Sequence, residues 1–471
     1  MVNVTAVRTT GIYCRAGCPA KPLERNTEQY RSQVAAEVNG FRPCLRCRPD
    51  REPGLDLDAD APLPLRRALA AISAGALDDG DEAELAAGVG YSERHLRRLF
   101  VEQIGATPAE VARSRRAHFA RRLLDDSNLS ITDIAFAAGF NSVRQMHRVM
   151  RQTFGFPPSD LRKWRKGAPD AVDGGLALSL AAPGLDWPST LAHLAPRATP
   201  GVEAVTGDRY GRTFELCGNV GVLELGQSRP DRLDVVLHLP DYGGVIDLVH
   251  RIRRLVGLDL PAAAEIEAIC EDELLGPLAT DHGDVRIPGA WDPFETLIRV
   301  ILGQQVSVVG ASTTAGRVVA AATPQIDGLD RLGLSHRFPN AVELAAADLS
   351  DCGLTTRRHD TLLGVAAAVA SGTVDLAAPA DELRAALCEL PGIGPWTAEL
   401  CAMRISRDLD AFPGSDLGLR DGVGQLTGSG RASADEVHDV AARWAPFRAM
   451  AATLLWSTGS VASTARAALA G

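Results

Sequence analysis

The stretch Leu390–Ala398, with the sequence LPGIGPWTA, is the most informative part of this 471-residue chain. Gly392 and Gly394 have no Cβ, so the turn can adopt φ > 0 and bring bare backbone close to a ligand, and helical character resumes at Thr397. Apolar residues flank the turn and predict two short packed helices. Amides at the start of the second helix would face an anion, for which we expect a DNA phosphate. The stretch predicts a helix-hairpin-helix, with an ordinary Pro/Gly turn between core helices as the alternative.

Two upstream stretches and one downstream carboxylate extend this pattern. They are WDPFE at Trp291–Glu295, ILGQQVS at Ile301–Ser307, and Asp416. Together with the hairpin they resemble the helix-hairpin-helix DNA glycosylase superfamily and its 3-methyladenine, AlkA-like branch. The resemblance implies that Asp416 is the catalytic residue for base excision. Superfamily members that also cleave the DNA backbone have a lysine where this chain has Trp396, so without that amine we expect hydrolysis and no lyase activity.

Excision of a base from a duplex requires the nucleotide to be flipped out and the resulting gap to be filled. By the resemblance, Gln305 matches the residue that family members insert into the gap, and the alternative is that this glutamine only decorates a helix. Glutamine could hydrogen-bond the orphaned base, although it is a weaker apolar wedge than leucine. The hairpin residues expected to hold the DNA are Gly392, Gly394 and Thr397.

N-alkylated purines carry positive charge and leave readily, so a carboxylate that stabilises charge on the sugar is sufficient for catalysis. Electron-rich rings can bind such a base by cation–π attraction of about 1–2 kcal/mol in a dry site. We expect Trp396 in the substrate pocket, with Trp456 as a second candidate that could also be an ordinary core tryptophan. Leu400 and Leu417 stand where the family pattern has tyrosines, which leaves the range of accepted bases open.

Four of the nine cysteines form two close pairs, Cys14 with Cys18 and Cys44 with Cys47, separated by 25 residues. Two pairs of thiolates suit tetrahedral Zn²⁺, and a module this small needs such a staple to fold. The spacing alone is more typical of a purely structural zinc ribbon, in which Cys14 would be inert. The five remaining cysteines have largely apolar neighbours in the sequence and are expected to be buried thiols.

The sequence around these cysteine pairs favours a reactive zinc site over a purely structural one. TTGIYCR at Thr9–Arg15 and GFRPCLRCRPD at Gly40–Asp50 resemble the Ada-type methylphosphotriester methyltransferase domain. The resemblance implies that Cys14 is both zinc ligand and methyl-accepting nucleophile. Methylation would lower the charge of a four-thiolate zinc centre from about −2 to about −1, which weakens its repulsion of DNA phosphates. Family members usually have a helix and a strand before the Thr9 stretch, whereas this sequence begins only a few residues upstream at Met1, so we expect metal binding here to be more secure than methyl transfer.

Two similar segments recur about fifty residues apart, Leu85–Pro108 and Ile134–Pro158. Each has a helix, a glycine-containing turn, a serine N-cap and a basic amphipathic helix, which predicts two helix-turn-helix units. The pair resembles the DNA-binding domain of AraC/XylS-type regulators, with recognition helices beginning near Ser92 and Ser142. The alternative is a helix bundle with no DNA role. The residues expected to contact DNA are Arg94, Arg97, Arg144, Gln145 and Arg148.

Charge is unevenly distributed along the chain, whose net charge is −10. Residues 1–170 hold 26 Lys and Arg against 21 Asp and Glu, whereas the remainder holds 23 against 38. The basic part is typical of a DNA-binding region. The acidic part is expected to hold DNA through local amides and a few arginines, with a weak non-specific electrostatic contribution.

The chain is predicted to be multidomain and mainly α. We expect an Ada-like zinc methyl-acceptor domain at 1–52, an AraC-type double helix-turn-helix domain at 64–166, a small antiparallel α/β subdomain at 176–285, and an all-helical helix-hairpin-helix glycosylase domain at 286–471. Linkers are expected at 53–64 and 166–175, where Pro and Gly interrupt the helical pattern. Alternating leucines that begin at Leu176 predict the strands of the α/β subdomain.

No signal peptide or long apolar segment is visible, so we expect a cytoplasmic, nucleoid-associated protein with no membrane partner. Zinc is the expected cofactor and double-stranded DNA the expected partner. Because one chain already carries two helix-turn-helix units, we expect a monomer. No cysteine follows Cys401, and the iron–sulfur motif of other helix-hairpin-helix glycosylases is therefore absent.

Taken with the resemblances, these features predict an alkylation-response fusion. Its C-terminal half would be a monofunctional DNA-3-methyladenine glycosylase, and its N-terminal part a methylphosphotriester sensor that accepts a methyl group once and regulates transcription. The alternative is a transcriptional regulator whose glycosylase-like part binds DNA but is inactive. Asp416 and the complete hairpin argue for the active enzyme.

Overall fold

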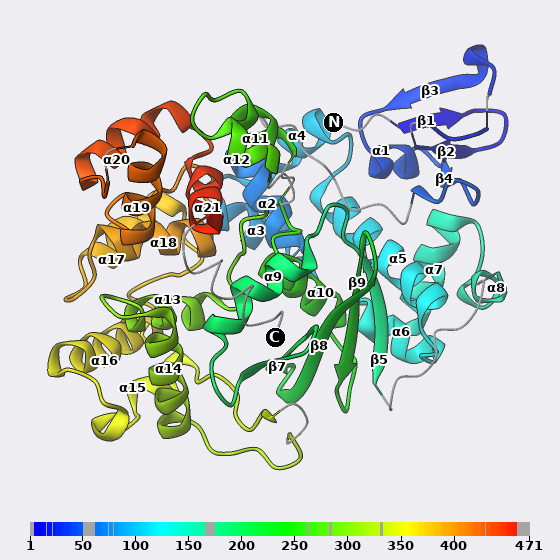
Figure 1. The fold of residues 1–471 in the computed structure, drawn as a ribbon. Helices are drawn as coiled ribbons and strands as arrows, with labels where there is room; N and C mark the ends of the chain where they lie inside the picture. Colours follow the sequence, from blue (N-terminus) through cyan, green and yellow to red (C-terminus); the bar gives the residue numbers. More distant parts are fainter. Residues whose placement is uncertain are drawn as a thin grey trace. The chain divides into compact units, whose positions relative to one another are not determined.

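A computed structural model describes most of the chain (Figure 1), and the described residues are 4–15, 17–20, 22–49, 62–73, 75–78, 80–164, 175–260, 263–281, 285–329, 333–428 and 430–458. Both predicted linkers fall almost entirely outside these ranges. The chain separates into two compact units. Unit 1 comprises Met1–Ala181, Leu216–Asn219 and Asp234–His250, and unit 2 comprises Ala182–Glu215, Val220–Leu233 and Arg251–Gly471.

Unit 1 begins with a small four-stranded sheet of order β3-β1-β2-β4. Its elements are β1 (Val4–Val7), β2 (Ile12–Cys14), β3 (Thr27–Tyr30), α1 (Gln33–Val38) and β4 (Arg42–Pro43). Because β2 and β4 are parallel and pair Tyr13 with Pro43, the residues that follow them, Cys14 and Cys44, come out at the same end of the sheet. One strand does precede Thr9: it is β1, which pairs with both β2 and β3.

The next part of unit 1 is helical and contains the two expected helix-turn-helix units, α3–α4 and α6–α7. Its helices are α2 (Leu63–Ser73), α3 (Glu82–Gly88), α4 (Glu93–Gln103), α5 (Pro108–Asp126), α6 (Ile131–Ala137), α7 (Val143–Phe154) and α8 (Pro158–Lys163). Ser92 and Ser142 are N-caps of α4 and α7, as predicted. Gly90 and Gly139 both take φ of +74° in the turns, which explains the glycine in each repeat.

A five-stranded sheet has the order β5-β9-β8-β7-β6. Its strands are β5 (Leu176–Ala181), β6 (Glu203–Thr206), β7 (Arg209–Leu216), β8 (Asn219–Arg229) and β9 (Arg232–His238), and the accompanying helices are α9 (Trp187–Leu194) and α10 (Val245–Leu255). Burial alternates along β5, as its leucine pattern predicts. In β8 six consecutive residues are buried, so both faces of that strand are covered.

The rest of unit 2 is helical. Its helices are α11 (Ala263–Cys270), α12 (Gly276–Asp281), α13 (Pro293–Leu302), α14 (Val308–Ala322), α15 (Ala341–Ala345), α16 (Thr356–Ala370), α17 (Ala380–Cys388), α18 (Pro395–Cys401), α19 (Leu417–Thr427), α20 (Ala434–Ala441) and α21 (Arg448–Thr458). A π-helical segment, Ala402–Ser406, continues α18. Such segments are uncommon and are frequent at functional sites.

Two apolar clusters support these helices. One is built around α13, α14, α16 and α17, and the other around α19, α20 and α21. The segment formed by α18 and its π-helical continuation contributes Ala398 and Cys401 to the first cluster and Ala402 and Met403 to the second. This segment therefore joins the two clusters, and Trp396 lies near its start.

The dispersed cysteines differ from the expectation. Cys352 and Cys401 are buried, but Cys217, Cys270 and Cys388 are exposed. Cys217 lies in a turn with φ of +50°, and Cys270 and Cys388 are the last residues of α11 and α17. Apolar neighbours in the sequence do not bury a side chain that follows a helix end or a turn. Among the described residues, no helix has both the length and the apolar character needed to cross a membrane.

Candidate functional site

Asp416 lies between two indole rings. Trp396 Nε1 donates to its Oδ2 at 3.1 Å, and Trp456 Nε1 donates to its Oδ1 at 2.8 Å. Asp416 is also the N-cap of α19, where Oδ1 accepts the amides of Gly418 and Leu419. The carboxylate thus has a fixed orientation and remains partly exposed. We call Asp416, Trp396 and Trp456 the excision site.

The hairpin glycines have different roles. Gly392 takes φ of +87°, and a Cβ there would stand 2.1 Å from Thr361 Oγ1, so only glycine fits. Gly394 is extended, with φ of −120°, and is the N-cap of α18 with no side chain to cap the helix. A Cβ at Gly394 would meet nothing within 4 Å, so glycine leaves the first amides of α18 uncovered. The expected positive φ is found at Gly392 only.

The two glutamines between α13 and α14 also differ. Gln304 Nε2 donates to Gly392 O at 3.2 Å and to Thr397 Oγ1 at 3.0 Å, which joins this loop to the hairpin. Gln305 is exposed and takes φ of +57°, an uncommon backbone conformation for a residue other than glycine. Thr397, which we predicted to contact DNA, is buried, and its hydroxyl accepts the hydrogen bond from Gln304. A left-handed residue at the tip of an anchored loop is consistent with an inserted side chain.

The four cysteines Cys14, Cys18, Cys44 and Cys47 come together in unit 1, with sulfur atoms all within 4.8 Å of one another. Burial raises the pKa of Cys14, and hydrogen bonds to Cys18 and Cys44 raise it further. Four adjacent thiolates therefore need a cation to hold them. Backbone amides of Arg46 and Cys47 donate to the Cys44 sulfur, as around a metal-bound thiolate. The donor set fits a tetrahedral metal ion.

We call Cys14, Cys18, Cys44 and Cys47 the metal-ligand cluster, and residues next to it are linked to α5 at two points. Tyr13, the residue before Cys14, donates through its hydroxyl to Glu37 Oε1 at 2.7 Å, and Glu37 also binds Ser114 and His118 of α5. Arg48, the residue after Cys47, forms an ion pair of 2.6 Å with Asp125, near the end of the same helix. Arg48 thus contacts α5, the helix that connects the two helix-turn-helix units, and Tyr13 is linked to the same helix through Glu37.

The residues of the recognition helices that are predicted to contact DNA differ in their exposure and in their partners within the protein. Arg94, Arg144 and Arg148 are exposed. Arg97 is exposed but forms ion pairs with Glu82 at 2.8 Å and Glu93 at 3.3 Å. Gln145 Oε1 accepts the Asn141 amide at 3.0 Å and so supports the start of α7. Direct base contact by these residues stays a prediction.

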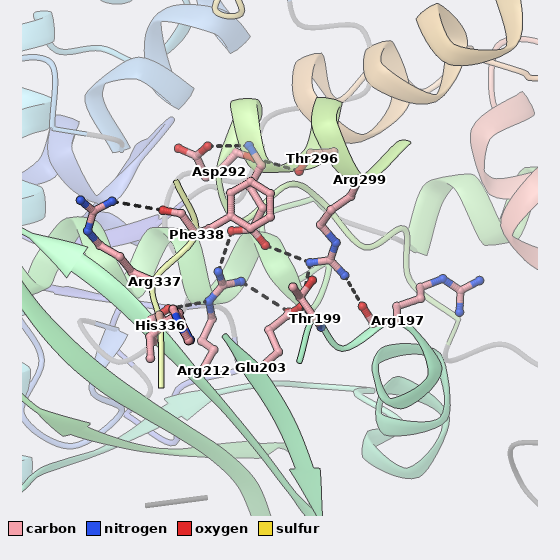
Figure 2. A network of polar contacts seen from close by, with 12 residues as sticks. Arg197, Thr199, Glu203, Arg212, Asp292, Thr296, Arg299, His336, Arg337 and Phe338 are labelled. Carbon is pink, nitrogen blue, oxygen red and sulfur yellow. Dashed lines mark hydrogen bonds and ion pairs between the residues drawn. The ribbon is translucent and has the colours of Figure 1, made fainter. Parts of the chain in front are cut away.

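Unit 2 contains a buried network of ion pairs that sequence analysis missed (Figure 2). Arg212 pairs with Glu295 at 2.7 Å, and Arg299 pairs with both Glu203 and Glu295 at 2.9 Å. Burial lowers the pKa of Arg212, but Glu295, Tyr210 and Glu203 outweigh it and raise this pKa above its ordinary value. We call Arg212 and Arg299 the paired arginines. WDPFE, the stretch in which Glu295 lies, thus contributes to packing as well as to family resemblance.

Arg404 contacts the excision site and Arg197 is influenced by the charge of Asp416, and we call these two residues the site arginines. Arg404 Cζ is 5.8 Å from the ring centroid of Trp456. Arg197 donates to His193 O at 2.9 Å, and Figure 2 shows its side chain pointing away from the paired arginines. Burial lowers the pKa of Arg404 to about 9, with Arg197 acting in the same direction. Burial and Arg299 lower the pKa of Arg197 to about 10, against the opposing effect of Asp416.

His193 completes this side of the site. Burial lowers its pKa well below the ordinary value, and the charges of Arg197, Arg404 and Arg299 lower it further, so the imidazole is neutral. His193 lies near the end of α9, and Arg197 lies four residues later in the 3-10 turn that follows it. That spacing was visible in the sequence, but nothing in the sequence connected it to Asp416.

Three family models match the chain. The metal binding domain of Ada matches residues 2–50, a helix-turn-helix domain matches 85–163, and the AlkA N-terminal domain matches 176–292. Over 285 residues the chain is 30% identical to "DNA-3-methyladenine glycosylase 2" of Escherichia coli, covering 59% of this chain and 95% of that protein. The solved 3-methyladenine DNA glycosylase of Archaeoglobus fulgidus shares the fold, with a TM-score of 0.51 over 59% of this chain and 97% of that one, at 22% identity.

One similarity covers nearly the whole chain. Over 467 residues it is 38% identical to the "Probable bifunctional transcriptional activator/DNA repair enzyme AlkA" of Mycobacterium tuberculosis, covering 97% of this chain and 92% of that protein. The similarity thus extends across nearly the full length of both units. The chain belongs to the AlkA family of bifunctional transcriptional activators and DNA repair enzymes.

Proposed function

We propose that the chain is a monofunctional DNA glycosylase that hydrolyses the N-glycosidic bond of alkylated purines, fused to a methylphosphotriester-sensing transcription regulator. The observation that carries the glycosylase is the carboxylate of Asp416, oriented by Trp396 and Trp456. The relatives named as a 3-methyladenine glycosylase and as a transcriptional activator support both activities.

In the proposed reaction, Asp416 stabilises positive charge on the deoxyribose as the bond to the base breaks and water attacks the sugar carbon. The two indole N–H groups keep both carboxylate oxygens in place, so little reorganisation is needed during the reaction. Trp396 stands where lyase members carry a lysine, and the chain therefore has no amine there to form a Schiff base with the sugar. The product is an abasic site with an intact backbone.

DNA would be held by the hairpin and by the loop that Gln304 anchors to it. The uncovered amides after Gly394 suit a phosphate, and the exposed Gln305 would enter the duplex in place of the flipped nucleotide. Gln304 hydrogen-bonds Gly392 and Thr397, and these bonds join the loop that carries Gln305 to the hairpin. Gln305 and the amides after Gly394 would therefore bind the same DNA duplex together.

The test is release of free base from methylated duplex DNA by the full chain, with the products separated by chromatography. Asp416→Asn should lower the release of 3-methyladenine by about 10²–10³-fold or more, as expected when one preorganised electrostatic group is removed. Asp421→Asn, on the exposed face of α19, is the matched control and should behave as wild type. Absence of release by the wild type would instead favour a regulator with an inactive glycosylase-like part.

For the N-terminal module we propose that Cys14, Cys18, Cys44 and Cys47 bind Zn²⁺ and that Cys14 accepts a methyl group. The zinc ion would keep the sulfurs as nucleophilic thiolates at neutral pH. The Cys14 sulfur attacks the methyl carbon of a phosphotriester, the carbon–oxygen bond breaks, and a phosphodiester anion leaves. Without a route back to the thiolate, each module reacts once.

Mass spectrometry of the zinc-loaded chain after exposure to DNA with methylphosphotriesters tests this proposal. We expect one added methyl group on Cys14 and none in Cys14→Ser. Cys217→Ser removes an exposed cysteine away from the cluster and should still be methylated. Zinc bound without any methylation would assign the module a structural role.

A further inference from the structure

The segment that leads into Asp416 has neither helix nor strand. It comprises residues 408–416, which we call the Asp416 loop, and lies between the π-helical segment Ala402–Ser406 and α19. The loop is nevertheless well buried in its middle, where Ala411 and Phe412 are 0% and 4% exposed. A segment without regular structure needs contacts from its neighbours to keep one conformation. Those contacts therefore decide where the Asp416 carboxylate stands.

Helix α18 contacts the Asp416 loop at two points. Trp396 donates to the Asp416 carboxylate, as described above. Glu399, three residues later on α18, accepts the amide of Phe412 through Oε2 at 3.0 Å. Residues three apart lie on the same face of a helix. The face of α18 that orients the carboxylate thus also holds the backbone four residues before it.

Helix α21 also contacts the loop at two points. Trp456 donates to Asp416, and Arg448 donates to the two carboxylate oxygens of Asp410 at 2.7 and 2.6 Å. The loop is therefore held by α21 near its start and at its end. Glu399 of α18 holds its middle.

Little conformational freedom remains between Phe412 and Asp416. Gly414 N donates to Phe412 O at 2.9 Å, and the next turn is closed by Asp416 N, which donates to Pro413 O at 2.8 Å. The proline ring fixes its own φ. A Cβ at Gly414 would lie 2.4 Å from His438 Cε1, so the backbone there lies directly against another side chain. A displacement of Phe412 would therefore carry over to Asp416.

Glu399 is itself fixed by an arginine of the hairpin. Arg384 belongs to α17, the first helix of the hairpin, and its Nε lies 2.9 Å from Glu399 Oε1. Arg384 Nη2 donates to Glu399 Oε2 at 3.2 Å and also pairs with Asp408, the first residue of the loop. Both oxygens of Glu399 thus face donors of the protein. Glu399 is therefore suited to hold the loop rather than to touch the DNA.

Resting on the glycosylase activity proposed above, we propose that Glu399, held by Arg384, is a positioning residue for base excision. It fixes the backbone of the Asp416 loop so that the carboxylate reaches the sugar of the flipped nucleotide. Displacement of a reacting group by about 1 Å can lower a rate about 100-fold. Glu399 therefore affects the chemical step and not the affinity for DNA.

The first measurement is single-turnover release of 3-methyladenine from methylated duplex DNA by the full chain. Glu399→Ala removes the acceptor for the Phe412 amide, and we expect release to fall about ten-fold to a hundred-fold. Glu399→Gln keeps an oxygen for that amide and should retain most of the wild-type rate. Affinity for a duplex with a tetrahydrofuran abasic site, which cannot react, should be unchanged in both variants.

A double-mutant cycle tests whether Glu399 acts through Asp416. In the Asp416→Asn background the carboxylate that Glu399 positions is gone, so addition of Glu399→Ala should leave the residual rate of release unchanged. If Glu399→Ala instead lowers the rate by the same factor in both backgrounds, Glu399 does not act through Asp416 and the positioning role is refuted.

The matched control is the ion pair of Arg337 with Glu343 of α15. These side chains are 20% and 29% exposed, against 21% and 28% for Arg384 and Glu399. Glu343 likewise accepts a backbone amide, that of Asn340, at 2.9 Å. Glu343→Ala should therefore cost similar stability, which thermal unfolding measures, and should leave base release as in wild type.

The remaining outcomes separate the two proposals. If wild type releases no base, the glycosylase proposal fails and the positioning role fails with it. If wild type releases 3-methyladenine and Glu399→Ala releases it equally fast, the glycosylase stands and the positioning role is refuted. The same conclusion follows if Glu343→Ala loses as much activity as Glu399→Ala, or if Glu399→Ala weakens binding to the abasic duplex as much as it lowers the rate.

Discussion

Two pairs of arginines in unit 2 have opposite surroundings. Arg212 and Arg299 are held by the carboxylates of Glu203 and Glu295 in a buried network (Figure 2). Arg197 and Arg404 are partly buried near a single carboxylate, that of Asp416, with which neither forms an ion pair. The first pair is saturated by the protein, and the second retains donors for a ligand. The contrast separates charges that hold the fold from charges that are available to a substrate.

The pKa values of the two pairs reflect this difference. Burial lowers the pKa of Arg299, but Glu203 and Glu295 outweigh burial and raise it above its ordinary value. Within the described part of the chain no carboxylate compensates for the burial of Arg404, and its pKa falls to about 9. Arg404 is still protonated at neutral pH, although its charge is less well stabilised. A ligand with acceptor atoms would therefore stabilise Arg404 more than it would stabilise a paired arginine.

The largest effect on stability is expected from breaking the paired set. Arg212→Met leaves Glu295 as a buried charge with one partner fewer, and removal of one member of a buried pair costs about 3–5 kcal/mol of unfolding free energy. Urea unfolding of the full chain measures this. Arg431→Met, which removes an exposed ion pair, should leave the unfolding midpoint unchanged. An Arg212→Met variant as stable as wild type would show that the ion-pair network does not stabilise the fold.

Acidification should weaken the same network. Burial raises the pKa of Glu203, but Arg299, Arg212 and the Tyr210 hydroxyl outweigh it, so this pKa lies below its ordinary value of 4.5. A lowered pKa in the folded state means that the stabilisation is complete above pH 4.5 and is lost as pH falls through the folded value. The difference in unfolding free energy between wild type and Glu203→Gln should therefore shrink at acid pH. A difference independent of pH would contradict this assignment.

A smaller effect, on the rate of base release, is expected from removing one of the hydrogen bonds that orient Asp416. Trp456→Phe keeps an aromatic ring but removes one hydrogen bond to Asp416, worth about 1 kcal/mol, so base release should fall roughly five-fold. Single-turnover release of 3-methyladenine measures it. Trp444→Phe is the control, because Trp444 is buried and bonds Asp272 instead. Equal losses in the two variants would indicate general destabilisation rather than orientation of Asp416.

The smallest effect on stability is expected from the site arginines themselves. Arg404→Met removes a charge that no described carboxylate compensates, which should stabilise the fold. It also removes one hydrogen bond to Pro288 O, which should destabilise the fold. The unfolding free energy should stay within about 1 kcal/mol of the wild-type value. Urea unfolding alongside Arg212→Met gives the direct comparison. A loss as large as that of Arg212→Met would show that Arg404 also holds the fold.

Much of the architecture could be predicted because its signals are local. The two cysteine pairs, the repeated helix–glycine–serine pattern and the hairpin are each short, and short motifs constrain their own backbone. Gly392 illustrates the limit: its positive φ was expected from the sequence, but its steric requirement comes from Thr361 in another helix. Gly394 looked equivalent in the sequence, yet it is extended and serves as an N-cap.

The sequence by itself determined which chemical groups are available: four thiols at zinc spacing, a hairpin, and an aspartate at the position that the family resemblance predicts to be catalytic. Only the tertiary structure decided that Trp456 shares this aspartate with Trp396, and that Arg197 and Arg404 have no ion-pair partner among the residues that the structure describes. The physical reason is that the charge state and the free donors of a side chain depend on burial and on neighbours that are distant in the sequence. Arg212 and Arg404 are identical as residues, and their different roles follow from the carboxylates that the fold brings to one and not to the other.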